Sequence, residues 1–180
     1  SARAVTDVSR NVPDDILRLV TKNGGIVMVT FVPGFVSEQA SAWDRARTAE
    51  ATRLETESAD DVSAVEAKLA AWIRANPAPR ATIADVADHV DHIRKIAGIE
   101  HIGLGGDFDG ISQVVQGLED VSTYPALTAE LLRRGYSDED IGRINNSNIL
   151  RVMREAERVA ARLQGERAPS SLLFEGQPGR

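Results

Sequence analysis

The residues most suited to chemistry in this 180-residue chain lie in the stretch 101–110, which reads HIGLGGDFDG. Its first half is an apolar run typical of a buried strand, and Gly105 and Gly106 lack a Cβ, so backbone or substrate can approach closely there. Asp107 and Asp109 follow where the strand gives way to a loop. A carboxylate at the end of a buried strand costs desolvation free energy unless a metal, a cation or hydrogen bonds compensate it. The pattern favours catalysis or ligand contact at Asp107, and a simple turn-capping role stays open.

A second group of polar residues lies on one predicted helix. Asp85, Asp88, His89 and His92 have the side-chain types that bind zinc. At about 100° per residue, these four side chains centre nearly opposite the apolar stripe of the same helix. We therefore interpret them as a solvated face, with a metal site as the less favoured alternative.

The glycines and acids of the stretch 101–110 complete no familiar loop motif. Asp107 and Asp109 lack the further ligand positions and the closing glutamate of a calcium loop. Gly103 and Gly105 are not followed by a third glycine at the dinucleotide-binding spacing, and no P-loop lysine follows Gly110. Calcium and nucleotide sites are therefore weak alternatives, and no G-x-S-x-G elbow or Ser/His/Asp set is visible.

Arg10 precedes the first predicted helix. Its planar guanidinium matches a carboxylate in a bidentate arrangement, so Arg10 is a candidate clamp for a carboxylate group of a ligand. Judged from its local sequence alone, an ordinary surface arginine is the commoner explanation.

Composition describes an ordinary globular domain and excludes several classes of partner. The apolar fraction is 42% and the charged fraction 27%, and 180 residues suffice for one domain with a core. A net charge of −6 without a Lys/Arg cluster argues against nucleic-acid binding. The chain has no cysteine, which excludes disulfides and thiolate metal sites, and no apolar run reaches the roughly 18 residues of a membrane span.

The elements that must position these residues follow an α/β order. Asn11 is expected to cap a helix that ends at 23–25, and the apolar run 26–31 (IVMVTF) predicts a strand covered on both faces. Residues 37–76 predict one or two amphipathic helices, and Pro77 and Pro79 break the pattern. Thr82 and Asp85 resemble a capping box that opens a helix to residue 97, ahead of a strand over 99–108. Further helices are expected at 125–134, from 137, and after the break at 145–148.

Several stretches together resemble the renal (membrane) dipeptidase family, and the similarity spans residues 1 to about 155. The helical insertion at about 37–80 resembles the bacterial branch of that family. The stretches occur in the family's order and are RNVPDD (10–15), IVMV (26–29), VADHVDHI (86–93), GGDFDG (105–110), GLEDVS (117–122), YPAL (124–127), ELLRRG (130–135) and NILRV (148–152).

The resemblance implies a fold, a reaction and three site residues. The family consists of (β/α)8 TIM-barrel hydrolases that cleave dipeptides with two zinc ions bridged by a hydroxide. Asp107 matches the active-site aspartate, which implies proton transfer from the attacking water to the leaving amine. Arg10 matches the arginine that holds the substrate's terminal carboxylate, and Phe35 falls where an aromatic residue lines the substrate pocket.

The zinc ligands are where this chain departs from the family. The family's His-x-Asp pair, bridging Glu and two histidines all map before Ser1, and none of His89, His92 and His101 matches a ligand. The chain therefore resembles the C-terminal part of the barrel enzyme. We expect an N-terminal segment to complete it, as a separate chain or as further sequence. The alternative is an inactive barrel fragment or binding module without metals.

The remaining expectations concern organisation and location. Residues 1–164 are expected to form part of a single barrel domain, and 165–180 a polar, extended tail. Because the tail has no hydrophobic anchor signal, we expect a soluble, cytoplasmic bacterial enzyme. The family's dimers make a homodimer a further expectation.

Overall fold

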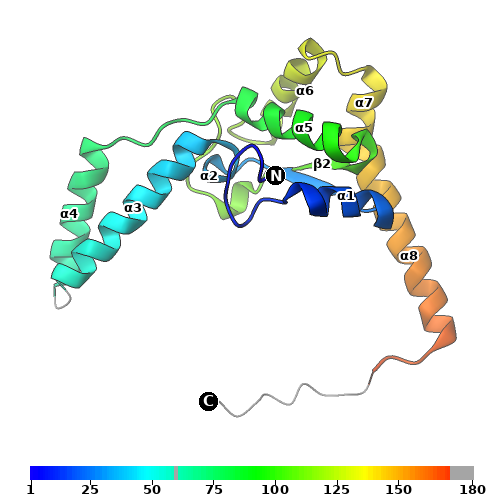
Figure 1. Cartoon of the computed structure of the whole chain (residues 1–180), viewed down its shortest axis with the longest axis horizontal. Coiled ribbons are helices and arrows are strands. Elements are labelled where there is room, and N and C mark those ends of the chain that lie inside the picture. Colours follow the sequence, from blue (N-terminus) through cyan, green and yellow to red (C-terminus); the bar gives the residue numbers. More distant parts are fainter. Residues whose placement is uncertain (59–60, 171–180) are drawn as a thin grey trace.

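Two short parallel strands form the centre of the molecule (Figure 1). The computed structural model describes residues 1–58 and 61–170. Strand β1 (Val27–Thr30) pairs with β2 (Ile102–Gly105) in parallel, from Val27 opposite Ile102 to Thr30 opposite Gly105. A Cβ on Gly103 would lie 2.5 Å from the sulfur of its partner Met28, so any larger residue here would force the Met28 side chain to move. Both strands are shorter than predicted, and β2 is flanked by 3-10 turns at Ile99–His101 and Phe108–Gly110.

Helices make up most of the described chain. A π-helical turn at Arg143–Ser147 runs directly into the last helix, so the predicted break at 145–148 is wrong. The last helix ends at Glu166, two residues beyond the predicted boundary of the tail, and residues 171–180 of that predicted tail lie outside the described residues. The helices are α1 (Asp14–Asn23), α2 (Pro33–Val36), α3 (Glu38–Glu57), α4 (Val62–Ala75), α5 (Ile83–Ala97), α6 (Tyr124–Arg133), α7 (Asp138–Gly142) and α8 (Asn148–Glu166).

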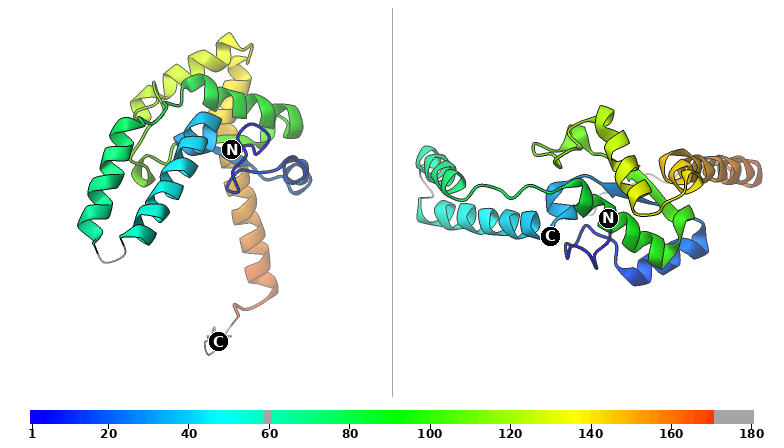
Figure 2. Two further views of the ribbon diagram at one scale, coloured as in Figure 1. Left: turned by 60° about the vertical axis from the view of Figure 1, so that its left-hand side comes forward. Right: turned by 90° about the horizontal axis from the view of Figure 1, so that it is seen from above.

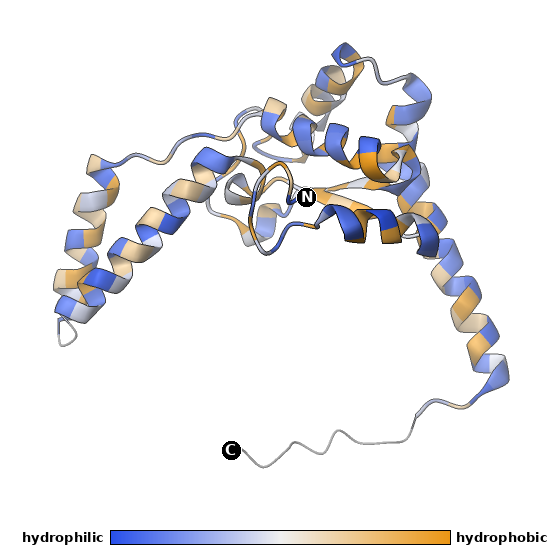
Figure 3. Cartoon of the chain, in the orientation of Figure 1, coloured by the Kyte–Doolittle hydropathy of each residue, from blue (hydrophilic) through white to orange (hydrophobic). Residues whose placement is uncertain are grey.

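The core lies between the strands and helix α5. Figure 3 shows hydrophobic colours gathered where α1, α5 and the strands meet. Val86, Val90 and Ile93 of α5 are fully buried, as are Val29 of β1 and Ile102 of β2. The apolar stripe predicted for α5 and the capping box at its start are thus confirmed. In β1 alternate residues are only half-buried, so the second face of this strand is covered less than the sequence suggests.

Two helical projections leave this body on different sides (Figures 1 and 2). Helices α3 and α4 form a hairpin in which the Trp43 and Trp72 rings lie 6.0 Å apart between centroids, and Trp43 Nε1 donates to Asn76 O at 2.7 Å. This hairpin confirms the helices predicted between residues 37 and 76. In α8, by contrast, only Asn148 is buried. Within the described residues, no helix is both long enough and apolar enough to cross a bilayer.

Candidate active site

The candidate site lies at the edge of the sheet where both strands end. Because β1 and β2 are parallel, the segments that follow them leave from the same edge. After β1 the chain enters α2, which carries Phe35, and after β2 it passes through Gly106 and Asp107 into a 3-10 turn. The two strands thus bring residues 31–36 and 106–110 to one edge.

Asp107 has the most unusual backbone of the described residues. Its φ is 61°, and no other non-glycine residue among the described residues has a positive φ. An L-residue in this left-handed region costs about 1–2 kcal/mol, which persists only where the surroundings fix it. Its carbonyl accepts the Gly110 N–H at 3.0 Å, and a Cβ on Gly110 would lie 2.6 Å from Asp107 Oδ1.

The carboxylate of Asp107 is free, although its backbone is held. The residue is exposed, and its side chain has no hydrogen-bond partner among residues 1–58 and 61–170. It makes no capping hydrogen bond to the turn that follows. The structural alternative of a turn cap is therefore not observed, and the carboxylate is available to a ligand.

Three aromatic rings hold the segment that contains Asp107. Phe31 lies 6.2 Å from Phe108 and 5.3 Å from Tyr124, and Phe108 lies 6.2 Å from Tyr124, all between ring centroids. These rings leave no room for a side chain at Gly106, where a Cβ would lie 2.7 Å from Phe108 and 2.9 Å from the Tyr124 hydroxyl. The aromatic cluster fixes the turn against the end of β1 and supports the strained backbone of Asp107.

Arg10 and Phe35 are in direct contact. The guanidinium carbon of Arg10 lies 5.1 Å from the centroid of the Phe35 ring, a cation–π arrangement. Arg10 is exposed, and no carboxylate of the described residues pairs with it. Its donors are thus free for an incoming carboxylate. No contact joins either residue to Asp107 within the described ranges; what they share is the edge of the sheet.

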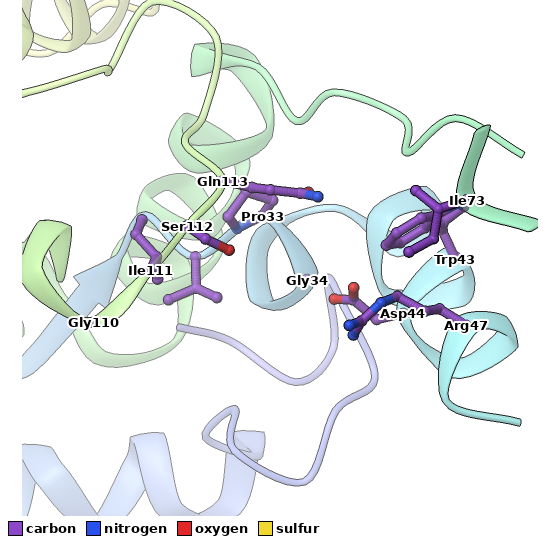
Figure 4. A pocket seen from close by; sticks show the side chains of 11 residues that line it. Pro33, Gly34, Trp43, Asp44, Arg47, Ile73, Gly110, Ile111, Ser112 and Gln113 are labelled. Atoms are coloured by element: carbon purple, nitrogen blue, oxygen red, sulfur yellow. The ribbon is translucent and has the colours of Figure 1, made fainter. Parts of the chain in front are cut away.

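Two cavities border this edge on the side of the α3–α4 hairpin. The first has a volume of about 400 Å³, and in Figure 4 Trp43, Asp44 and Arg47 lie opposite Ser112 and Gln113 across it. The second, of about 600 Å³, is lined by Phe35 and by residues 7–9 of the segment before Arg10. Asp44 lines both, and desolvation raises the pKa of its carboxyl group. Neither Asp107 nor Arg10 lines these cavities.

His89 overturns the prediction of a solvated face on α5. Its side chain is fully buried, its Nδ1 accepts the Ala2 N–H at 2.9 Å, and its Nε2 lies 3.2 Å from Val36 O. An Nδ1 that accepts leaves the proton on Nε2, so Nε2 donates to Val36 O. Burial lowers the pKa of His89 to about 4, which keeps it neutral. The spacing gave a signal: His89 follows Val86 by three residues and precedes Ile93 by four, the spacing of a shared helix face.

Two other members of that predicted polar face, Asp88 and His92, also have partners, as does the neighbouring Asp91. His92 Nε2 lies 2.7 Å from Asp14 of α1. Arg134, at the end of α6, reaches Asp88 and Asp91 at 2.6 Å each, and its Nε bonds to the buried Glu130 at 2.6 Å. These contacts join α5 to α1 and α6. The face that we expected to be solvated is therefore covered in part: His89 is buried and His92 is half-buried, while Asp88 stays exposed.

No metal-binding cluster is formed by the described residues. No group of three or more His, Asp, Glu or Cys side chains there lies close enough to hold an ion. The third histidine, His101, has its Nδ1 2.7 Å from Gly25 O, to which it donates. The residues present do not fit a zinc pair, so the chemical steps assigned to this chain use its own side chains alone.

Asn11 was misread from the sequence. The N-cap of α1 is Pro13, and no side chain caps this helix. Asn11 is instead 2% exposed, and its Nδ2 donates to Thr6 O at 2.9 Å and to Phe35 O at 2.8 Å. The contact with Phe35 joins residues 24 positions apart, which no local pattern reveals.

Comparisons with known proteins agree on one family. Residues 1–167 match the family described as membrane dipeptidase (peptidase family M19). Among curated proteins, Dipeptidase 3 of Rattus norvegicus is 38% identical over 174 residues, which are 97% of this chain and 28% of the relative. Dipeptidase 3 of Homo sapiens is 41% identical over 159 residues, 88% of this chain and 25% of the relative. The chain thus spans about a quarter of the length of these curated relatives.

Solved structures show a related fold. The probable dipeptidase PvdM from Pseudomonas aeruginosa superposes with a TM-score of 0.65 and 25% identity, over 84% of this chain and 42% of that one. A metallo peptidase from Rhodobacter sphaeroides, liganded with a phosphinate mimic of the dipeptide L-Ala-D-Ala, has a TM-score of 0.57 and 24% identity, over 82% of this chain and 32% of that one. The described chain is therefore a mostly helical part of such a fold, with a small parallel sheet.

Proposed function

Because this chain belongs to the membrane dipeptidase family, peptidase family M19, we propose that it is part of a zinc-dependent dipeptidase. In this proposal Asp107 transfers a proton, Arg10 binds the terminal carboxylate of the dipeptide, and Phe35 lines the substrate pocket. The observation that carries it is the free carboxylate of Asp107, held in a left-handed backbone at the end of β2. Sites at the carboxyl ends of strands are the rule in barrel enzymes.

The proton role of Asp107 follows from what its carboxylate can do. One carboxylate oxygen accepts a proton from water as the water oxygen bonds to the carbonyl carbon of the peptide. The same oxygen then gives that proton to the amide nitrogen as the C–N bond breaks, which yields a carboxylic acid and an amine; the acid then loses its remaining proton to the amine or to water and becomes a carboxylate. An exposed carboxylate without a competing partner is suited to this exchange.

Arg10 orients the substrate. A guanidinium presents parallel N–H donors to both oxygens of a carboxylate, and its stacking on Phe35 leaves those donors free. A dipeptide places its carboxylate one residue from the scissile bond, so one fixed contact sets the position of that bond. Such a clamp would favour free dipeptides over longer or blocked peptides.

The described residues are only one part of the proposed enzyme. We propose that residues 1–164 belong to one (β/α)8 barrel domain, with 165–180 as its tail, and that a preceding N-terminal segment completes the barrel. In this proposal the zinc ligands would lie in that segment, and zinc, when bound there, would supply Lewis-acid activation of water. A homodimer and a bacterial cytoplasmic location stay predictions from the sequence.

A second candidate function is a binding module without catalysis, which the lack of a metal-ligand cluster among the described residues favours. A dipeptidase assay and zinc analysis on the protein that contains this chain separate the two. Two zinc ions per complex together with dipeptide hydrolysis support the enzyme. If the complete protein contains no zinc and does not hydrolyse dipeptides, the binding module is the right interpretation.

A further inference from the structure

The orientation of Arg10 depends on more than its own side chain. The guanidinium is exposed, and within the described residues it contacts the Phe35 ring without a polar partner. An arginine side chain carries about 2 kcal/mol of rotamer entropy, so a ring contact alone does not confine it. The backbone of residues 3–12, here called the arginine loop, has to be fixed relative to α2 for the two side chains to stay in register.

Asn11 makes the connection at the required place. It is the neighbour of Arg10, it is 2% exposed, and its Nδ2 donates to Thr6 O at 2.9 Å within the loop. The same nitrogen donates to Phe35 O at 2.8 Å, the carbonyl of the residue whose ring Arg10 covers. Its Oδ1 accepts no hydrogen bond in the described part of the chain, so the donors alone hold the amide.

His89 gives the loop a second attachment to α2, farther from Arg10. Its Nδ1 accepts the N–H of Ala2, which directly precedes the loop, its Nε2 donates to Val36 O of α2, and Nε2 also lies 3.3 Å from the hydroxyl of Thr6 in the loop. Thr6 is therefore shared by both attachments. The loop and α2 form one hydrogen-bonded unit, and Asn11 is the part of it that adjoins the clamp.

We propose that Asn11 is a positioning residue for substrate recognition, which holds the Arg10 guanidinium over Phe35 in the orientation that receives the dipeptide carboxylate. This inference rests on the proposed dipeptidase function. Asn11 does not touch the substrate in this scheme; it acts through Arg10.

The chain contains a matched control at the opposite edge of the sheet. Asn148 is 3% exposed, and its Nδ2 also donates to two backbone carbonyls, Ile99 O at 2.7 Å and Ile102 O at 2.9 Å. Ile102 begins β2, so these bonds lie at the end of the strand away from Asp107. Loss of Asn148 removes the same number and kind of hydrogen bonds without touching the arginine loop.

The kinetic test uses the complete, metal-loaded enzyme and a dipeptide with a free carboxylate. Asn11→Ala should raise KM about tenfold, equivalent to about 1.4 kcal/mol, with kcat changed less than about twofold. Asn148→Ala should leave KM unchanged. In an Arg10→Met background, Asn11→Ala should have no further effect on KM, because the group that it positions is gone.

The outcomes separate this inference from the proposed function. An unchanged KM in Asn11→Ala, or an equal rise with and without Arg10, overturns the positioning role while dipeptidase activity stands. A wild-type enzyme that does not hydrolyse dipeptides refutes the proposed function itself. If Asn11→Ala folds poorly, Asn11→Ser, which keeps a hydroxyl donor, replaces it with and without Arg10→Met. Asn11→Ser should also raise KM when Arg10 is present.

A measurement independent of activity completes the test. Arg3, Asn11 and Val12 donate their backbone N–H groups to Val12, Val8 and Ser1 carbonyls at 2.8–3.0 Å. Hydrogen exchange of these three amides should be faster in Asn11→Ala than in wild type and unchanged in Asn148→Ala. Exchange that does not differ between wild type and Asn11→Ala would show that Asn11 does not hold the loop.

Discussion

Helix α5 and the carboxyl edge of the strands both carry residues suited to chemistry, and the structure treats them in opposite ways. On α5, His89 is buried between the arginine loop and α2, while Asp91 accepts from Arg134 and Tyr136. At the strand edge, Asp107 and Arg10 are exposed and without polar partners among the described residues. Side chains whose hydrogen-bonding capacity is used internally stabilise the fold, and those left free are available to a ligand.

The largest expected effect is at the free carboxylate. Asp107→Asn in the complete enzyme should lower kcat for dipeptide hydrolysis by roughly a hundredfold or more, because an amide cannot carry the proton. Asparagine tolerates the left-handed backbone well, so the free energy of unfolding should change by less than about 0.5 kcal/mol. Steady-state kinetics and urea unfolding of one preparation check both. Turnover within a few-fold of wild type would contradict the proton-transfer role of Asp107.

The ion-pair cluster on α5 should show the reverse pattern. Arg134→Met removes the partner of Asp88, Asp91 and the buried Glu130. The free energy of unfolding should fall by about 2 kcal/mol, a value between those of exposed and fully buried pairs. Measured per folded molecule, kcat and KM should stay at wild-type values. A change in KM without loss of stability would mean that this cluster takes part in binding.

Lowering the pH should reveal how much the buried, neutral His89 contributes to the stability of the fold. In the folded chain the pKa of His89 is about 4, below its ordinary value of 6.5, so the unfolded state binds the proton more readily. Its contribution to stability is complete above pH 6.5 and is lost as the pH falls towards 4; between pH 7.5 and 5 this amounts to about 2 kcal/mol. Urea unfolding at the two pH values measures it. His89→Gln should lose this part of the pH dependence, and an identical slope in both proteins would contradict the assignment.

The smallest expected effect is at the clamp itself. Arg10→Met should raise KM at least about tenfold, or about 1.4 kcal/mol, for dipeptides with a free carboxylate. Dipeptide amides, which have no carboxylate to bind, should show little change. Stability should be nearly unaffected, because Arg10 is exposed and contributes mainly its ring contact. Equal rises in KM for acids and amides would argue against a carboxylate clamp.

The local features of the fold could be predicted from the sequence, and the contacts between distant segments could not. Thr82 and Asp85 define the start of α5 by their spacing, and the capping box is present. The family resemblance pointed to Arg10 and Phe35 as substrate-binding residues; the two side chains are in contact, and their roles stay predictions. His89 and Asn11 were misplaced because their partners, Val36 and Phe35, lie 53 and 24 residues away. Helical periodicity describes one helix and does not show which neighbours cover its second face.

One experiment tests most directly whether the strand edge serves catalysis and the α5 ion pairs serve stability. It measures turnover per folded molecule and unfolding free energy together in Asp107→Asn and Arg134→Met. We predict that the first variant loses turnover and keeps its stability, while the second loses stability and keeps its turnover. If Asp107→Asn retains turnover and Arg134→Met loses it at full stability, the strand edge is not the catalytic side of the proposed dipeptidase.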